Sequence, residues 1–149
     1  MIRTIYIYIL LFLGIIGSQG ICVAQDLEGD IQKCVQTAGK DVTYLKDFVV
    51  NLAAAPPNQK PPVFRTSLAL RKGVIYRFSI CNDDSSEGEA VLRLYDQANL
   101  LLSTFYPETG KEYKSISFAC QKSAAYTVVI SFKEGKKGEA IGILSYVNK

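Results

Sequence analysis

The stretch VIYRFSI, residues 74–80, alternates apolar and polar side chains and decides the fold. In an extended chain Tyr76, Phe78 and Ile80 face one side, while Arg77 and Ser79 face the other. A period of two residues is typical of a β-strand that buries one of its faces. The stretch therefore predicts a strand in a sheet that packs against a core on one side.

Seven further stretches have a similar strand-rich composition, with polar turns between them. AVLRLY, residues 90–95, alternates in the same way, and the turn after it, residues 96–99, is rich in residues that bond their own backbone. The connection KEGKKGE joins the last two stretches as a glycine-containing hairpin. The other predicted strands are 42–52, 64–70, 100–105, 115–120, 126–132 and 140–147. Eight short strands predict an all-β fold, an antiparallel β-sandwich of about eight strands with a jelly-roll-like form.

Residues 1–24 have the outline of a signal peptide. Arg3 precedes the apolar run 5–17, and Cys22 and Ala24 are small residues at positions −3 and −1 of a cut before Gln25. The run is shorter than the roughly 20 residues that a membrane-spanning helix needs. The sequence therefore predicts an exported protein of the periplasm, the outer surface or the medium, with no transmembrane segment in the mature chain.

The mature chain reads as one domain. Without residues 1–24, 125 of the 149 residues remain, which is enough for a single hydrophobic core. Residues 25–41 form a polar lead-in with room for a short helix, and 42–149 form the β-sandwich domain. The proline-rich segment 53–62 is a surface connection within it. Removing Arg3 changes the net charge from +3 to +2, a mild balance that does not indicate a nucleic-acid partner.

Three cysteines remain after cleavage, so at most one intramolecular disulfide leaves one thiol over. Cys81 closes the third predicted strand and Cys120 the sixth, and three crossings of an up-down sandwich place them at opposite ends. Cys34 precedes the first strand, near the end where Cys120 emerges. The count of crossings therefore predicts a Cys34–Cys120 disulfide with Cys81 unpaired.

The inventory of reactive residues argues against an enzyme. The sequence has no histidine, which excludes Ser-His-Asp and Cys-His nucleophile systems and the usual general base. It also lacks a phosphate-binding loop and a dinucleotide fingerprint, so we expect no cofactor. A two-carboxylate hydrolase using Glu87, Glu89, Asp96 or Glu108 stays open, because such pairs are defined by spacing in three dimensions.

Phe105, Tyr106 and Tyr113 lie around the turn PETGKE and are candidates for a surface contact with a sugar or a peptide. The absence of tryptophan from the sequence makes a carbohydrate-stacking surface the weaker of the two interpretations. Single exposed apolar groups are also ordinary on protein surfaces.

Three stretches resemble the bacterial pre-peptidase C-terminal domain: LALRKGVIYRFSI, AVLRLYDQANLLLSTF and SISFACQKSAAYTVVIS. The resemblance covers about residues 66–147 and rests on structural positions, namely Gly73, Tyr76, Phe78, Leu94, Tyr95, Asp96, Tyr126 and Val128. The chain departs from the family at Ala124-Ala125-Tyr126, where the family usually has Gly-Thr-Tyr, and it carries no protease domain. The resemblance implies a secreted, non-catalytic accessory module.

The acidic loop after Cys81, NDDSSEGE, has two interpretations. Some members of the family that the chain resembles bind calcium near the start of the Leu-Tyr-Asp strand, and the resemblance makes Glu87, Glu89 and Asp96 the calcium candidates. The twelfth residue counted from Asp83 is Leu94, so the loop is not an EF-hand. Short side chains that bond their own backbone, followed by glycine, also form a plain exposed turn. We favour the turn and predict no bound metal.

Two classes of function therefore compete. The first is a non-catalytic envelope or secreted module that binds an extracellular protein or a glycan. The alternative is a carboxylate-based hydrolase, or an inhibitor of a hydrolase. A deep pocket with two shielded, convergent carboxylates would favour the enzyme, and a flat surface with aromatic or basic patches would favour the module.

Overall fold

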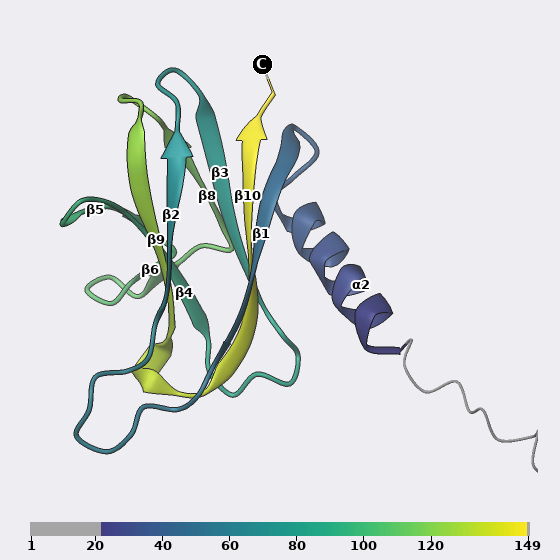
Figure 1. Cartoon of the computed structure of the whole chain (residues 1–149), viewed down its shortest axis with the longest axis vertical. Helices are drawn as coiled ribbons and strands as arrows, with labels where there is room; N and C mark the ends of the chain where they lie inside the picture. The colour runs from purple at the N-terminus through teal and green to yellow at the C-terminus, as the bar shows by residue number, and fades with distance from the viewer. Residues whose placement is uncertain (1–21, 149) are drawn as a thin grey trace, which may run out of the picture.

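A computed structural model describes residues 22–148, and their main body is two antiparallel sheets packed face to face (Figure 1). The first sheet has the order β1 (Val42–Leu52), β10 (Gly138–Val147), β3 (Ile75–Asn82) and β8 (Ser115–Ala119). The second has the order β2 (Phe64–Leu70), β9 (Ala124–Phe132), β4 (Ala90–Asp96) and β5 (Asn99–Ser103). The predicted all-β sandwich is confirmed.

Each of the eight predicted stretches contributes one strand to these two sheets, although the predicted strand 100–105 is too long, since β5 ends at Ser103 and Phe105 belongs to a separate hairpin. The structure adds a small hairpin that the sequence did not predict, β6 (Phe105–Tyr106) with β7 (Lys111–Glu112). It also adds a 3₁₀ turn, Lys133–Gly135, after β9. Within residues 22–148 no helix is long and apolar enough to span a membrane.

The core lies between the sheets and consists of the residues that alternate inward. Phe78, Leu92, Leu94, Val128 and Ile130 are completely buried there. The edge strands β1 and β2 are linked across one side of the sandwich by Phe48 and Phe64, whose ring centroids lie 6.1 Å apart. The alternation in VIYRFSI therefore places Phe78 at the centre of the core, as predicted.

Helix α2 (Cys22–Thr37) occupies most of the predicted lead-in and lies against the outer face of the first sheet (Figure 1). Ile31 and Val35, four residues apart on one side of the helix, pack with Cys34 on Ile141 and Ile143 of β10. The apolar stripe on the helix is narrow, and it matches the small apolar cluster on the outer face of the first sheet. Residues 1–21, most of the predicted signal peptide, lie outside the described residues.

The end of α2 is fixed by Arg77 on the outer face of β3. Its guanidinium donates a hydrogen bond of 2.7 Å to the carbonyl of Ala38 and two, of 2.7 and 3.1 Å, to the carboxylate of Asp41. Gly39 has a φ of +100°, which lets the chain turn from the helix into β1. Arg77 thus joins the helix terminus to the sheet.

The predicted Cys34–Cys120 disulfide is wrong, because Cys34 is bonded to Cys81 with a Cα–Cα distance of 5.8 Å. Cys120 is a buried free thiol. Cys81 and Cys120 do lie at opposite ends of β3, since Gly73, just before that strand, donates to the carbonyl of Cys120 at 2.8 Å. The face of the sheet decides the pairing: Cys34 and Cys81 meet under α2, whereas Cys120 points into the core between the sheets.

Candidate functional site

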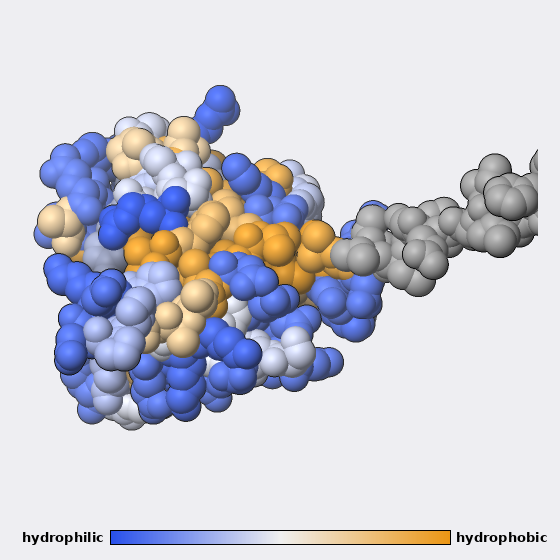
Figure 2. Space-filling view, turned by 60° about the horizontal axis from the view of Figure 1, so that its bottom comes forward, coloured by the Kyte–Doolittle hydropathy of each residue, from blue (hydrophilic) through white to orange (hydrophobic). Residues whose placement is uncertain are grey.

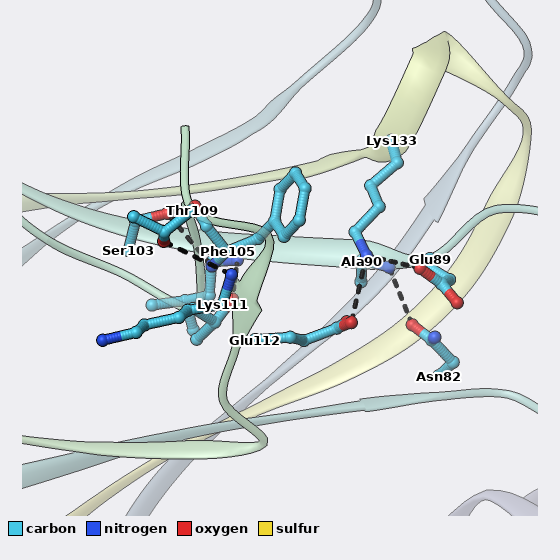
Figure 3. A network of polar contacts seen from close by, with 11 residues as sticks. Asn82, Glu89, Ala90, Ser103, Phe105, Thr109, Lys111, Glu112 and Lys133 are labelled. Atoms are coloured by element: carbon cyan, nitrogen blue, oxygen red, sulfur yellow. Dashed lines mark hydrogen bonds and ion pairs between the residues drawn. The ribbon is translucent and has the colours of Figure 1, made fainter. Parts of the chain in front are cut away.

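A cleft of about 570 Å³ opens beside α2, at the place where β8 no longer covers the edge of β3. Pairing between β3 and β8 ends at Ser79 and Ser115, and the Ile80 N–H still donates to the Lys114 carbonyl at 2.9 Å, so only Cys81 and Asn82 of β3 have no strand partner on that side. The Asn82 amide oxygen instead accepts a hydrogen bond of 2.8 Å from the backbone of Ala90 in the second sheet (Figure 3). The Cys34–Cys81 disulfide also lines the cleft.

Acidic side chains dominate the rim, and we call this feature the acidic cleft. In the part of the chain that the structure describes, five carboxylates and two ammonium groups line it: Asp26, Asp30, Asp83, Asp84, Glu112, Lys33 and Lys114. The pKa of Lys33 lies above its ordinary value, first because its ammonium donates a hydrogen bond to Asp30, and also because of the charges of Asp30, Asp84 and Asp26. The hydrogen bond and the surrounding charges therefore favour the charged form of Lys33.

The acidic loop of the sequence forms one wall of the cleft and closes on itself. The carboxylate of Asp83 accepts hydrogen bonds from the backbone N–H and the hydroxyl of Ser85, the former at 2.8 Å. These bonds, the hydroxyl one first, lower the pKa of Asp83. Ser86 donates its N–H to the carbonyl of Asp83 at 3.0 Å. The loop therefore has the self-bonded turn geometry that its composition predicts, and it leaves Asp84 exposed.

The three calcium candidates do not converge. Glu87 pairs with Lys137 at 3.0 Å, and Glu89 pairs with Lys133. Asp96 is the last residue of β4, whereas Glu89 directly precedes the first residue of that strand. Asp96 lies opposite Asn99 in the backbone pairing of β4 with β5. Among residues 22–148 no three acidic, cysteine or histidine side chains are grouped so as to hold a metal ion.

We therefore expect millimolar calcium to leave the unfolding temperature of the mature chain unchanged. Alanine at Glu87 or Glu89 should shift that temperature only slightly, because an exposed ion pair contributes about 0.2 to 1 kcal/mol. Thermal unfolding with and without calcium checks this. A large calcium-dependent rise that the two substitutions abolish would instead make this loop a metal site.

Phe105, Tyr106 and Tyr113 do not form a common aromatic platform. Tyr106 and Tyr113 meet edge to face, with centroids 6.3 Å apart, and the Tyr106 hydroxyl accepts a hydrogen bond from the backbone of Ser103. The Phe105 ring lies under the ammonium of Lys133, 4.1 Å from the ring centroid. Only Tyr113, 39% exposed, lines the acidic cleft.

Lys133 connects three segments that are distant in the sequence (Figure 3). Its ammonium pairs with Glu89 before β4 and lies 3.1 Å from Glu112 of the hairpin, while its backbone N–H donates to the Glu89 carbonyl at 2.9 Å. The hydrogen bond from Lys133 lowers the pKa of Glu89, and the bond to Glu89 is the first cause of the raised pKa of Lys133. Lys133 thus holds the hairpin, and with it one wall of the cleft, in place. Sequence analysis missed this residue because no local pattern marks it.

None of the carboxylates in residues 22–148 is buried. Among residues 22–148 the buried polar residues are all hydroxyl-bearing: Ser79, Ser103, Thr104 and Ser145. Asp41, Asp83 and Glu89 have lowered pKa values, each because a neighbouring side chain donates a hydrogen bond to the carboxylate. A general acid requires the opposite shift. Glu108 lies exposed in the turn of the β6–β7 hairpin.

No protein-family model matches the sequence, and no curated protein matches it. The resemblance to pre-peptidase C-terminal domains therefore stays a prediction. Among solved structures the chain is similar to PliG of Aeromonas hydrophila, a periplasmic lysozyme inhibitor of g-type lysozyme. The TM-score is 0.47 at 11% sequence identity, and the match covers 72% of this chain and 88% of PliG. At this level of similarity the likeness gives no information on function, which we infer from the site alone.

Proposed function

We propose that the mature protein is an exported, non-catalytic module that binds another protein, and that the acidic cleft receives a lysine- or arginine-rich segment of that partner. The observation that carries this proposal is the charge of the cleft: among the described residues five carboxylates and two ammonium groups line it, and Glu112 is also paired with Lys133, whereas the mature chain has a net charge of +2. Local and overall charge thus have opposite signs. The surface feature is an acidic cleft, not the basic or flat aromatic patch that we expected of a binding module.

A protein partner suits this cleft better than a glycan. A sugar ring stacks on an open aromatic face, whereas Tyr106 and Tyr113 are turned edge to face and Phe105 already faces Lys133. The rim instead offers several exposed carboxylates, which accept hydrogen bonds from ammonium and guanidinium groups. Each exposed pair is worth only about 0.2 to 1 kcal/mol, so the partner must present several cations at once.

Isotope-labelled chain 25–149, titrated with a hexa-arginine peptide, tests the proposal by NMR. We expect the amide signals of Lys33, Asp84 and Tyr113 to shift, and the affinity to fall as salt is added. Asp84→Lys should weaken binding about tenfold, because it removes an attraction and adds a repulsion.

Glu108→Lys is the matched control, since it makes the same change of charge at an exposed residue outside the cleft. Equal losses in the two variants would show that only net charge matters, and would overturn the cleft as the site. Shifts confined to other surfaces would do the same.

A hydrolase inhibitor is the special case in which the partner is an enzyme. A g-type lysozyme, the enzyme that PliG inhibits, is one suitable test enzyme. If this case holds, adding the mature chain lowers the rate of lysis, Asp84→Lys removes the effect and Glu108→Lys keeps it. If the rate is unchanged, this enzyme is excluded as the partner.

A further inference from the structure

Helix α2 has a second hollow on its other flank, between the helix and β1. It measures about 530 Å³, and its apolar lining comes from Leu27, Ile31 and Val35 of the helix and from Tyr44 of the strand. We call it the α2–β1 groove. Figure 2 shows a band of hydrophobic residues that begins at the start of α2.

The local geometry explains why these residues line one groove. Leu27, Ile31 and Val35 recur every four residues, so they lie one above another on the same side of the helix. Opposite them, the pairing of β1 with β10 shifts register between Tyr44 and Lys46. The extra residue brings Tyr44 and Asp47, three positions apart, to the same face, where the Tyr44 hydroxyl donates to the Asp47 carboxylate.

The groove is open to solvent. Leu27 is 41% exposed and Tyr44 42%, and Val49, on the same outer face of β1, is 48% exposed. Nothing in residues 22–148 covers these side chains. A group of large apolar side chains left open beside a hollow is typical of a protein-binding surface.

The charged residues that line the groove indicate what kind of partner group binds there. Among the described residues, Glu28 and Asp47 are the only charged ones that line it, and both are acidic. Among residues 22–148 neither of them forms a salt bridge. A second copy docked symmetrically would bring these acids toward each other, and an anionic membrane would be repelled.

We infer that the α2–β1 groove seats an apolar side chain of the protein partner that is adjacent to a lysine or arginine. The inference rests on the proposed function and extends it, because the same helix separates the groove from the acidic cleft. The partner then contacts α2 on both flanks, with cations in the cleft and an apolar residue beside a cation in the groove. The Cys34–Cys81 bridge fixes the helix between them.

Two peptide probes separate the groove from the cleft. The first is a 14-residue amphipathic peptide of leucine and lysine, and the second has the same lysines with every leucine replaced by serine. We expect the mature chain to bind the first at least tenfold more tightly, because only leucine gains from burial in the groove. Leu27→Glu should remove this difference, whereas Leu100→Glu, at a leucine of similar exposure on β5, should keep it.

The outcomes distinguish the two proposals. Equal affinity for both peptides, lost in Asp84→Lys, would overturn the groove and keep the cleft. No binding of either peptide would overturn the proposed function itself. Leu27→Glu adds a glutamate near the start of a helix, where acidic residues are tolerated, and circular dichroism confirms the fold.

Two further measurements test the rival occupants. Sedimentation of the mature chain alone should show a monomer, and a dimer that Leu27→Glu disrupts would assign the groove to a second copy. Flotation with phosphatidylcholine vesicles should recover no protein. Flotation that Leu27→Glu abolishes and Leu100→Glu keeps would assign the groove to a lipid surface. Either result would overturn the inference.

Discussion

Replacing both Cys34 and Cys81 by alanine is expected to lower the free energy of unfolding by about 2 to 4 kcal/mol. The bridge spans 47 residues, so its loss returns the entropy of a long loop to the unfolded chain. The helix is otherwise held by a small apolar cluster and by Arg77. Urea denaturation measures the change, and hydrogen exchange should show α2 losing protection first.

Cys120→Ala is the control for this experiment, because it removes the buried thiol that forms no bridge. Its effect should be about 1 kcal/mol, the value for a small change of volume in a core. Peptide mapping of the oxidised wild-type chain must recover the Cys34–Cys81 peptide. A recovered Cys34–Cys120 peptide would show that α2 does not lie on the outer face of the first sheet.

Phe78→Ala is expected to lower the free energy of unfolding by about 3 to 5 kcal/mol. Phe78 is fully buried at the middle of β3, between the sheets, and alanine would leave a cavity that the surrounding strands cannot close. Chemical denaturation followed by circular dichroism measures the loss. In a domain of this size such a change removes a large part of the total stability.

Leu100→Ala serves as the matched control, since this leucine is 49% exposed on the edge strand β5. Its effect should stay within about 0.5 kcal/mol. Similar losses in the two variants would mean that Phe78 is not at the centre of the core. The comparison thus tests the inward alternation on which the fold prediction rests.

The strands could be predicted from the sequence because a strand that buries one face has apolar residues at every second position. This alternation is visible in a short stretch of sequence. The same period could have corrected the disulfide. Cys81 continues the outward series of Arg77 and Ser79, whereas Cys120 continues an inward series, so the two sulfurs face different sides of the first sheet. The number of strand crossings gives the end of the sandwich at which a cysteine lies, but not the face of the sheet to which its side chain points.

Helix α2 was harder to predict because only a few of its residues pack against the sheet. Ile31, Cys34 and Val35 contact a small cluster on β10, Leu27 of the same side stays exposed, and the other positions from Asp26 to Thr37 are polar or glycine. The sequence of the lead-in therefore shows little periodicity. A wider apolar face on α2 would have given the sequence a clear helical periodicity. It would also have left no exposed helix residues to line the acidic cleft or the α2–β1 groove.

The candidate site was the least predictable part of the molecule. The acidic loop was recognisable as a turn, and Tyr113, one of three aromatic residues predicted as a possible surface contact, lines the cleft. The cleft, however, also requires that β8 begins only at Ser115 and that α2 lies beside β3, and Lys133 fixes one of its walls. These features depend on contacts between residues far apart in the chain, which no local pattern encodes.

The central position of β10 determines when the fold can be completed. It is made after every other described strand, yet it pairs with both β1 and β3, and Thr43 lies opposite Tyr146. Until β10 is synthesised, β1 and the edge of β3 that faces β10 have no partner, and α2 lacks the β10 residues on which it packs. Pairings of such long sequence separation give slow, millisecond-to-second folding. The nascent chain therefore keeps unpaired strand edges until its final segment emerges, and it is during this interval that aggregation or chaperone binding competes with folding.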